Sequence, residues 1–428
     1  MIKNKQSIRW VVAGLLFLST GINYLDRQTL SILAATIQAD LKIDDVGYAT
    51  ITSYFLLSYT VMYAISGGLV DFVGTRRSLV IAVSGWSVAS MLHGFVNSAS
   101  HLSIVRFLLG GFESANYPAG AKAISEWFPI HERALGIGIL AAGSAFGAAV
   151  AAPLVSYIAL LMGWRVAFIF VGAIGFIWVL LWYFIYHPAS SHPKLSADDR
   201  AFLIGSPEQF GKFSRFGLKA LLNNRRTWGC ILIRVFTDPI VYFVSFWVPK
   251  YLITVHGFTL SDIGKYVWIP FVALSGGNIL GGFITSTLVS RGLSVNRVRN
   301  TLMLASSILM FFSCFGAAFA ASPMIAIAGL TGLSLGHGLW GNIAVPAEVF
   351  PSHSVAFVSG LGGTLGGVAG IASQYGIAWS SSHHAYPYIF IVFSVFPLLA
   401  FLAVKLLIGN LGEISHNLDT RTPQGSNL

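Results

Sequence analysis

Residues 106–118 read RFLLGGFESANYP and place an arginine and a glutamate inside a segment that is otherwise apolar. A separation of seven residues returns Glu113 to nearly the same helical face as Arg106, about 10.5 Å further along the axis. A charged side chain at the centre of a membrane-spanning helix costs about 2.5–3.5 kcal/mol, so such residues normally face a bundle interior or a water-filled pathway. The stretch indicates either a functional site within a membrane or a buried structural ion pair.

The composition excludes a water-soluble globular protein. Hydrophobic residues make up 55% of the 428-residue chain, and charged residues make up 10%, against about 25% in a soluble domain. The net charge of +10 comes from basic residues scattered between apolar runs, a pattern typical of membrane-protein loops and not of nucleic-acid-binding surfaces. Cys230 and Cys314 lie in apolar runs without metal or redox spacing, so we expect free buried thiols. We expect no metal, no cofactor and no nucleic-acid partner.

Apolar segments long enough to cross a hydrocarbon core of about 30 Å occur six times in each half of the chain. The segments cover about residues 10–36, 46–70, 77–97, 101–123, 134–160, 164–186, 228–253, 264–290, 299–320, 323–347, 354–380 and 385–408. The sequence therefore predicts an all-α integral membrane protein with twelve transmembrane helices.

A polar segment with several prolines and charges separates the two sets of six. We predict an N-terminal six-helix bundle over residues 1–187 and a cytoplasmic linker over 188–227, with a short amphipathic helix at about 213–223. A C-terminal six-helix bundle over 228–410 and a cytoplasmic tail over 411–428 follow.

Basic residues are distributed unevenly between the two sides of these segments. They gather at the N-terminus, near 76–77 and 133, in the linker, at 291–299 and in the tail, which share one side if every segment crosses. Short cytoplasmic loops are enriched in Lys and Arg, so we expect both termini in the cytoplasm. The exceptions on the opposite side are Lys42, Arg165, Lys250 and Lys265.

Small residues crowd the fifth apolar segment of each half. They read GIGILAAGSAFGAAVAA at 136–152 and GLGGTLGGVAGIA at 360–372. Such residues let helix backbones approach closely, and their recurrence in matching positions argues for two related bundles, with generic close packing within each half as the alternative.

The loop between the second and third segments carries a spaced motif. Residues 67–77 read GGLVDFVGTRR and keep the pattern G-x-L-x-D-x-x-G-x-R-R. This motif resembles the cytoplasmic signature of the major facilitator superfamily, whose members are two six-helix bundles around a central substrate path with alternating access. The resemblance implies that the loop takes part in conformational gating. Physically, Asp71 near a helix end can meet an arginine or a helix N-terminus of the other bundle, and the alternative is a simple membrane-edge turn with basic anchors. The gating residues we expect are Gly67, Asp71, Gly74, Arg76, Arg77, Glu132 and Arg133.

Three further segments resemble one branch of that superfamily. They are NYLDR at 23–27, KAISEWFP at 122–129 and RVFTDP at 234–239. They are similar to segments of the anion:cation symporter family, and most of all to bacterial hexuronate and other sugar-acid transporters. The chain departs from that pattern at Asp238, where a glutamate is usual.

The resemblance implies roles for the charged and hydroxyl groups of the first half. Arg27 and Arg106 would bind the substrate carboxylate, Tyr24 and Tyr59 would supply hydroxyl groups, and Asp26 and Glu113 would carry the coupled protons. Physical chemistry supports these roles independently, because the planar fork of arginine suits a carboxylate and a desolvated carboxyl group can exchange protons near neutral pH. The alternative for Arg27 is a satisfied pair with a neighbouring carboxylate.

The second half offers mostly neutral hydrogen-bonding groups, which suit a hydroxylated sugar acid. The candidate substrate-binding residues there are Asp238, Tyr242, His337, Asn342, Thr364 and Gln374. The alternatives are ordinary ones: aromatic residues often pack or lie at the membrane interface, and a histidine often makes a helix contact.

We therefore expect a proton-coupled importer of a small carboxylated, sugar-derived anion of the hexuronate or aldonate type. It would be a monomeric, multi-pass protein of the bacterial inner membrane whose partners are its substrate, protons and the lipid bilayer. Alternatives are a facilitative or sodium-coupled carrier or exporter of another carboxylate, or a non-transporting membrane sensor. An enzyme is not expected, because the chain has no H-E-x-x-H motif and no appended soluble domain.

Overall fold

The computed structural model describes residues 3–129, 132–189, 221–350 and 352–412. All regular elements in these ranges are helices. The first half contains α1 (Lys3–Ile32), α2 (Ala34–Leu41), α3 (Asp45–Val73), α4 (Thr75–Leu92), η1 (His93–Phe95), α5 (Ala99–Glu113), α6 (Asn116–Trp127), α7 (Arg133–Met162) and α8 (Trp164–Ile185). The second half contains α11 (Arg225–Phe246), α12 (Val248–His256), α13 (Leu260–Tyr266), α14 (Trp268–Ser290), α15 (Val295–Ala318), α16 (Pro323–Trp340), η4 (Asn342–Ala344), α17 (Val345–Val349), α18 (Ser352–Ser382), α19 (Tyr386–Ala403) and η5 (Val404–Ile408).

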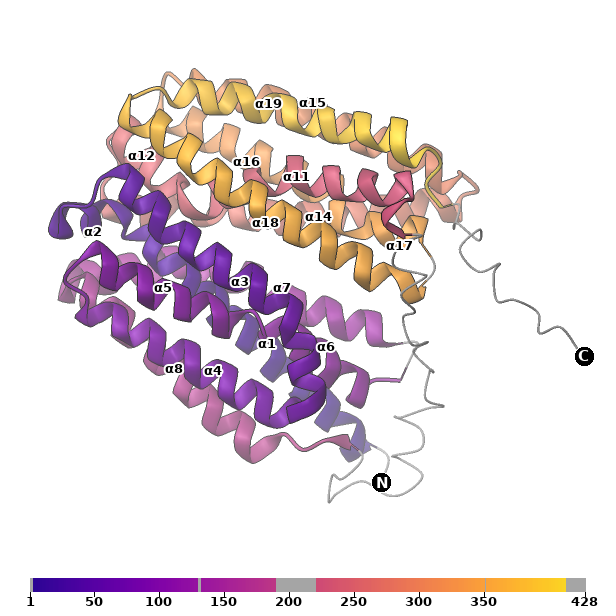
Figure 1. The fold of residues 1–428 in the computed structure, drawn as a ribbon, viewed down its shortest axis with the longest axis horizontal. Helices are drawn as coiled ribbons and strands as arrows, with labels where there is room; N and C mark the ends of the chain where they lie inside the picture. Colours follow the sequence, from indigo (N-terminus) through magenta and orange to yellow (C-terminus); the bar gives the residue numbers. More distant parts are fainter. Residues whose placement is uncertain (1–2, 130–131, 190–220, 351, 413–428) are drawn as a thin grey trace, which may run out of the picture.

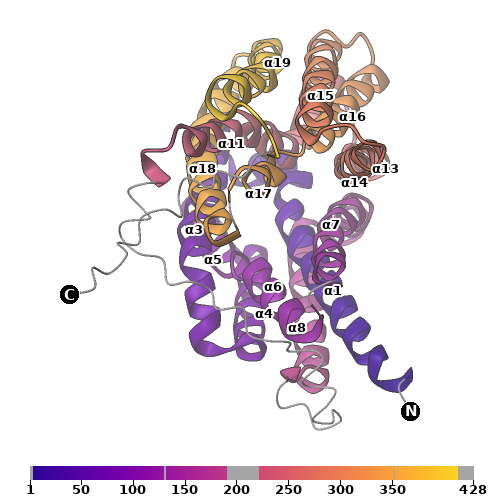
Figure 2. The ribbon, with the colours of Figure 1, turned by 90° about the vertical axis from the view of Figure 1, so that its right-hand side faces the viewer.

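The helices lie in two groups that follow the two halves of the chain. Figure 1 shows α1 to α8, in indigo to magenta, below α11 to α19, in rose to yellow, and Figure 2 shows the same separation from another side. The start of α1 and the end of η5 lie at one end of the molecule, which we call the terminal end. We call the opposite end, which carries α2 and α12, the distal end.

Ten helical stretches within the described residues are long and apolar enough to cross a membrane. This confirms a polytopic all-α membrane protein. The predicted segments at 101–123 and 354–380 are not among the ten. The predicted amphipathic helix at 213–223 lies outside the described residues except for its last three positions, as does nearly all of the predicted tail.

Several predicted segments are divided into two helices, which is a correction to the sequence-based boundaries. The segment at 101–123 ends one helix at Glu113 and begins another at Asn116, because Pro118 has no N–H to donate to the Ser114 carbonyl. The segment at 228–253 breaks at Trp247, where Pro249 occupies the first turn of α12.

Glycines bring the first helix of each half against the fifth predicted segment of the same half. In the first half α1 packs on α7, and in the second α11 packs on α18. A Cβ at Gly143 would lie 2.2 Å from the Phe17 carbonyl oxygen, and one at Gly147 would lie 2.0 Å from that of Gly21. The small-residue run of α7 therefore sets a backbone-to-backbone contact.

Two sets of helix contacts join the two halves. Helix α3 packs against α18, and α7 packs against α13 and α14. A Cβ at Gly367 of α18 would lie 2.5 Å from the Thr60 hydroxyl of α3. The glycines of α18 thus serve a joint between halves as well as packing within one half. Both cysteines are free and buried, as predicted.

We predict that Gly147→Ala weakens the packing of α1 on α7. The new methyl group would meet the backbone of Gly21, and overpacking of this kind costs about 1–3 kcal/mol. The purified protein in detergent should therefore unfold at a lower temperature than the native chain in a thermal melt.

Gly138→Ala is the matched control, since no atom lies within 4 Å of a Cβ built there on the same helix. Equal melting temperatures for the two variants would contradict the backbone contact as the cause.

Candidate functional site

Arg27 and Glu113 form an ion pair in the interior of the first half. The Arg27 Nη2 lies 2.9 Å from Glu113 Oε2, and its Nε donates to the same oxygen at 3.1 Å. The Glu113 side chain is fully buried, and that of Arg27 is 11% exposed. Glu113 is the last residue of α5, so the helix break before Pro118 lies directly beside this pair. Such a pair is costly to bury unless its geometry is good.

Aromatic rings surround the Arg27 guanidinium. Its central carbon lies 4.7 Å from the ring centres of both Tyr24 and Tyr59 and 5.1 Å from that of Phe55. Cation–π contacts of this length stabilise a positive charge that has little access to water. The structure therefore brings together Arg27, Glu113, Tyr24 and Tyr59, which the sequence selected separately.

Asp26 and Arg106 lie near this pair without hydrogen bonds of their own. Both are buried, and among the described residues neither the Asp26 oxygens nor the Arg106 guanidinium nitrogens have a hydrogen-bond partner. Glu113 and Arg106 act on the Asp26 carboxyl electrostatically. The alternative of an ion pair between Arg106 and Glu113 is wrong for this conformation, because Glu113 pairs with Arg27.

A second ion pair lies on α11 in the second half. Arg234 Nε donates to Asp238 Oδ2 at 2.8 Å, four residues further along the helix. The Asn342 amide donates to the Thr237 hydroxyl at 2.7 Å and approaches Asp238 Oδ1 at 3.5 Å. Arg234 was not among the predicted site residues, although it is the first residue of the RVFTDP segment.

Of the remaining predicted residues of the second half, Tyr242 and His337 lie near Arg234, and Thr364 bonds within its own helix. Tyr242 stacks on Phe246, with ring centres 6.2 Å apart. The His337 Nε2 is buried without a hydrogen-bond partner among the described residues, and the Thr364 hydroxyl donates to the Gly360 carbonyl of its own helix.

Gln374 joins the two halves. Its Oε1 accepts hydrogen bonds from the Thr52 hydroxyl at 3.0 Å and from the Trp247 indole at 2.7 Å. Because this amide oxygen is fully engaged in packing, Gln374 has a structural role in this conformation.

A polar cluster of Gln38, Asp45 and Lys250 closes the distal end between the halves. Lys250 of α12 forms an ion pair with Asp45 of α3 and donates to Gln38 Oε1 of α2 at 2.6 Å. The Gln38 amide nitrogen also donates to Asp45 Oδ1 at 3.1 Å. The bonds from Tyr48 to the Phe246 carbonyl and from Thr52 to Gln374 also cross between the halves. We call Gln38, Asp45 and Lys250 the distal latch.

The sequence reasoning missed the distal latch. One signal was available, because Lys250 was among the few basic residues on the side where the positive-inside bias expects none. A basic residue placed there against the bias indicates a specific partner.

The predicted gating residues lie at the terminal end and bond within the first half. Asp71 pairs with Lys122 at 2.8 Å and Glu132 pairs with Arg9 at 2.9 Å. The expected contact of Asp71 with an arginine or helix end of the other bundle is therefore wrong for this conformation. Charge pairs of this kind hold neighbouring helices of one half together.

Arg133 and Arg76 bind backbone carbonyls. Arg133 Nε donates to the Phe128 carbonyl at 3.2 Å, and Arg76 donates to that of Tyr183. Gly74 ends α3 at a φ of 87°, a conformation that favours glycine.

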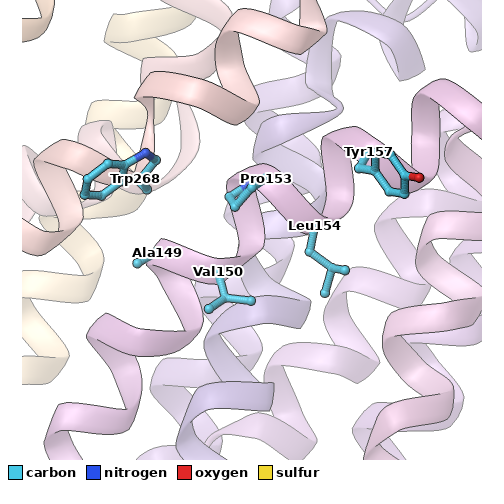
Figure 3. Close-up of a pocket in the computed structure, with 6 residues that line it drawn as sticks. All are labelled: Ala149, Val150, Pro153, Leu154, Tyr157 and Trp268. Carbon is cyan, nitrogen blue, oxygen red and sulfur yellow. The ribbon is translucent and has the colours of Figure 1, made fainter.

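An open groove of about 620 Å³ lies on the apolar periphery between α7 and α14. Figure 3 shows its lining residues, Ala149, Val150, Pro153, Leu154, Tyr157 and Trp268. The lining carries no charge, so this groove does not provide the cation that an organic anion requires.

Residues 332–336 read GLSLG and match the G-x-S-x-G pattern of hydrolase nucleophiles. That pattern functions on a sharp turn between a strand and a helix. Here it lies within α16, with Ser334 buried in the bundle. The segment is therefore part of helix packing.

Comparison with known proteins gives a consistent result. The profile of the Major Facilitator Superfamily matches residues 16–374. The hexuronate transporter of Escherichia coli (strain K12) is 29% identical over 414 residues, 95% of each chain. The galacturonate transporter of Dickeya chrysanthemi is 30% identical over 327 residues, 76% of this chain and 94% of that protein.

The fold also matches a solved structure. A bacterial homologue of the human lysosomal transporter Spinster, in an inward-facing and occupied conformation, aligns with 93% of this chain and 96% of its own. The TM-score is 0.74 at 16% sequence identity. The chain is thus a multi-pass transporter of the bacterial inner membrane and not an enzyme, and it belongs to the major facilitator superfamily.

Proposed function

We propose that this transporter imports a sugar acid of the hexuronate or aldonate type together with protons, by alternating access around a site near the middle of the membrane. The observation that carries this proposal is the buried Arg27–Glu113 pair, enclosed by Tyr24, Phe55 and Tyr59. The relatives named as hexuronate and galacturonate transporters support the substrate class.

The Arg27–Glu113 pair links a proton to substrate binding by competition. When Glu113 is ionised it occupies the guanidinium fork of Arg27. A proton on Glu113 removes that negative partner and leaves the fork to bind a substrate carboxylate. Loss of the proton restores the internal pair and expels the substrate carboxylate, so substrate release and proton release occur together.

Asp26 would be the second proton carrier. A buried carboxylate without a hydrogen-bonded cation is costly, and proton uptake removes that cost. Arg106 nearby would compensate part of the negative charge in whichever state lacks the proton. Taking up protons with the anion lets the central site keep its charge balance through the cycle.

The proposed orientation puts the terminal end in the cytoplasm. The distal latch then closes the outer side, and the inter-half bonds at the distal end support a conformation that is shut to the outside. Outward opening requires these bonds to break while the two halves rock about the site.

We further propose twelve crossings in a monomer, with bundles over 1–187 and 228–410. Helix α18 has 31 residues, about 46 Å at 1.5 Å per residue, which exceeds the hydrocarbon core of about 30 Å. Helices α5 and α6 cross together, interrupted where Glu113 meets Arg27.

We expect Glu113→Gln to abolish uphill uptake. In proteoliposomes with an inward proton gradient, the native chain should accumulate labelled glucuronate, galacturonate or galactonate. The variant should still exchange labelled for unlabelled substrate, because a neutral side chain leaves Arg27 free but carries no proton. Sodium-gradient uptake without a pH gradient is measured in parallel.

Asp40→Asn is the matched control. Asp40 lies at the exposed distal surface, where Arg165 donates to it at 2.7 Å and lowers its pKa. This variant should accumulate substrate as the native chain does. Accumulation by Glu113→Gln, or transport of none of the three acids, would contradict the proposal.

We expect Lys250→Met to favour the outward-open state. Removing one partner of a buried ion pair leaves the Asp45 carboxylate uncompensated. If the closed state loses about 1.4 kcal/mol of stability relative to the outward-open state, the outward-open population rises about tenfold. A cysteine at Thr52, in a background without the native cysteines, should react about tenfold faster with an impermeant maleimide added outside intact cells.

Lys42→Met in the same background tests whether charge alone matters, since Lys42 is an exposed lysine at the same end. It should leave the labelling rate unchanged. Equal rates for the Lys250 variant and its parent would show that the distal latch does not hold the outer side shut.

A further inference from the structure

Arg234 is a further arginine in the interior besides Arg27 and Arg106, and the proposed function leaves it without a role. Its side chain is 26% exposed. Only its Nε is engaged, by Asp238, and its two Nη groups donate no hydrogen bond among the described residues. Its Nη2 faces α18 at Gly363, where an added Cβ would lie 3.8 Å away. A guanidinium with two free donors can bind a carboxylate.

Glycines of α18 let that helix lie directly against this pair. A Cβ at Gly366 would lie 2.2 Å from Asp238 Oδ2, and one at Gly362 would lie 3.3 Å from Arg234 Cγ. A cavity of about 20 Å³, room for about one water molecule, lies beside Arg234. Asn342 and Ser359 line it together with apolar side chains, among them Ile343 and Val358. The surroundings of Arg234 are therefore not fully filled.

Arg27 and Arg234 lie at two ends of one tyrosine strip on α3. Tyr59 lies over Arg27, and Tyr59 stacks on Tyr63 with ring centres 5.9 Å apart. Tyr63 lies within electrostatic range of Arg234, and Tyr242 within range of both arginines. Tyr59 and Tyr63 are four residues apart on α3, about one helical turn, so the tyrosine strip runs from one arginine toward the other.

We propose that Arg234 and Asp238 form a second anion subsite, and that the preferred substrate is an open-chain six-carbon sugar diacid with a carboxylate at each end. This inference rests on the proposed function, because it assigns one carboxylate to Arg27. The terminal carbons of an extended six-carbon chain lie about 6 Å apart, from five C–C bonds of about 1.5 Å. Such an acid carries one carboxylate for each of the two arginines.

The two subsites use the same chemistry. Arg27 has Glu113 as its internal carboxylate, and Arg234 has Asp238. Each substrate carboxylate replaces one internal carboxylate at its arginine, once that acid carries a proton. A monoacid engages one arginine, whereas a diacid engages both and gains a second charge-assisted contact.

The test compares two ligands that differ at one carbon. Gluconate and glucarate are open-chain six-carbon acids of the same stereochemical series, with a hydroxymethyl group or a carboxylate at carbon 6. Binding to the purified full chain is measured by tryptophan fluorescence or calorimetry. We expect the native chain to bind glucarate at least about tenfold more tightly than gluconate.

Variants of α11 assign the preference to the subsite. Arg234→Gln should reduce the glucarate-to-gluconate affinity ratio about tenfold, with Arg234→Lys between it and the native chain, because lysine keeps the charge and loses the fork. Asp238→Asn should raise the ratio, since Arg234 then lacks its internal competitor. A structural role for the pair would change the ratio in the same direction in both variants. Arg225→Gln, at an exposed arginine on the same helix, should leave the ratio unchanged.

The outcomes separate this inference from the proposed function. If the native chain binds gluconate as tightly as glucarate, or Arg234→Gln keeps the native ratio, the second subsite is wrong and the sugar-acid function stands. If the native chain binds neither acid and transports no uronate, the proposed function is wrong.

Discussion

The structure depends on keeping charges inside an apolar bundle. Arg27 and Glu113 are buried together, and each would be costly alone. Three aromatic rings of the first half enclose the Arg27 guanidinium. The break between α5 and α6 lies at Glu113. The Arg234–Asp238 pair on α11 likewise combines an arginine with a buried carboxylate. The proposed anion sites are built from these two pairs.

Glycine provides the second constraint. Glycines of α7 bring α1 to backbone contact, and glycines of α18 face both α11 and α3. Helix α18 can thus contact Asp238 on one face and Thr60 of the other half on another. The contact between α18 and α3 is made largely of backbone and small side chains, so few large side chains interdigitate there. The hydrogen bonds between halves lie instead at the distal end, where Lys250 and Gln38 meet Asp45.

Much of this could be predicted from the sequence, for physical reasons. Long apolar runs predict spanning helices, and charges within them mark the interior, which is why Arg27 and Glu113 were identified before their contact was known. Partners could not be predicted in the same way. Helical spacing placed Arg106 and Glu113 on one face, yet Glu113 pairs with a residue 86 positions away. Lys250 and Arg234 were missed because their partners become visible only when helices from different parts of the chain are packed together.

The groove between α7 and α14 carries a consequence for the membrane itself. Its two walls belong to different halves, and its lining is apolar and open. In the proposed cycle, rocking of the halves would widen and narrow this groove, so lipid acyl chains beside it would enter and leave at each turnover. The viscosity of the surrounding lipid would then slow the conformational step independently of the affinity for substrate.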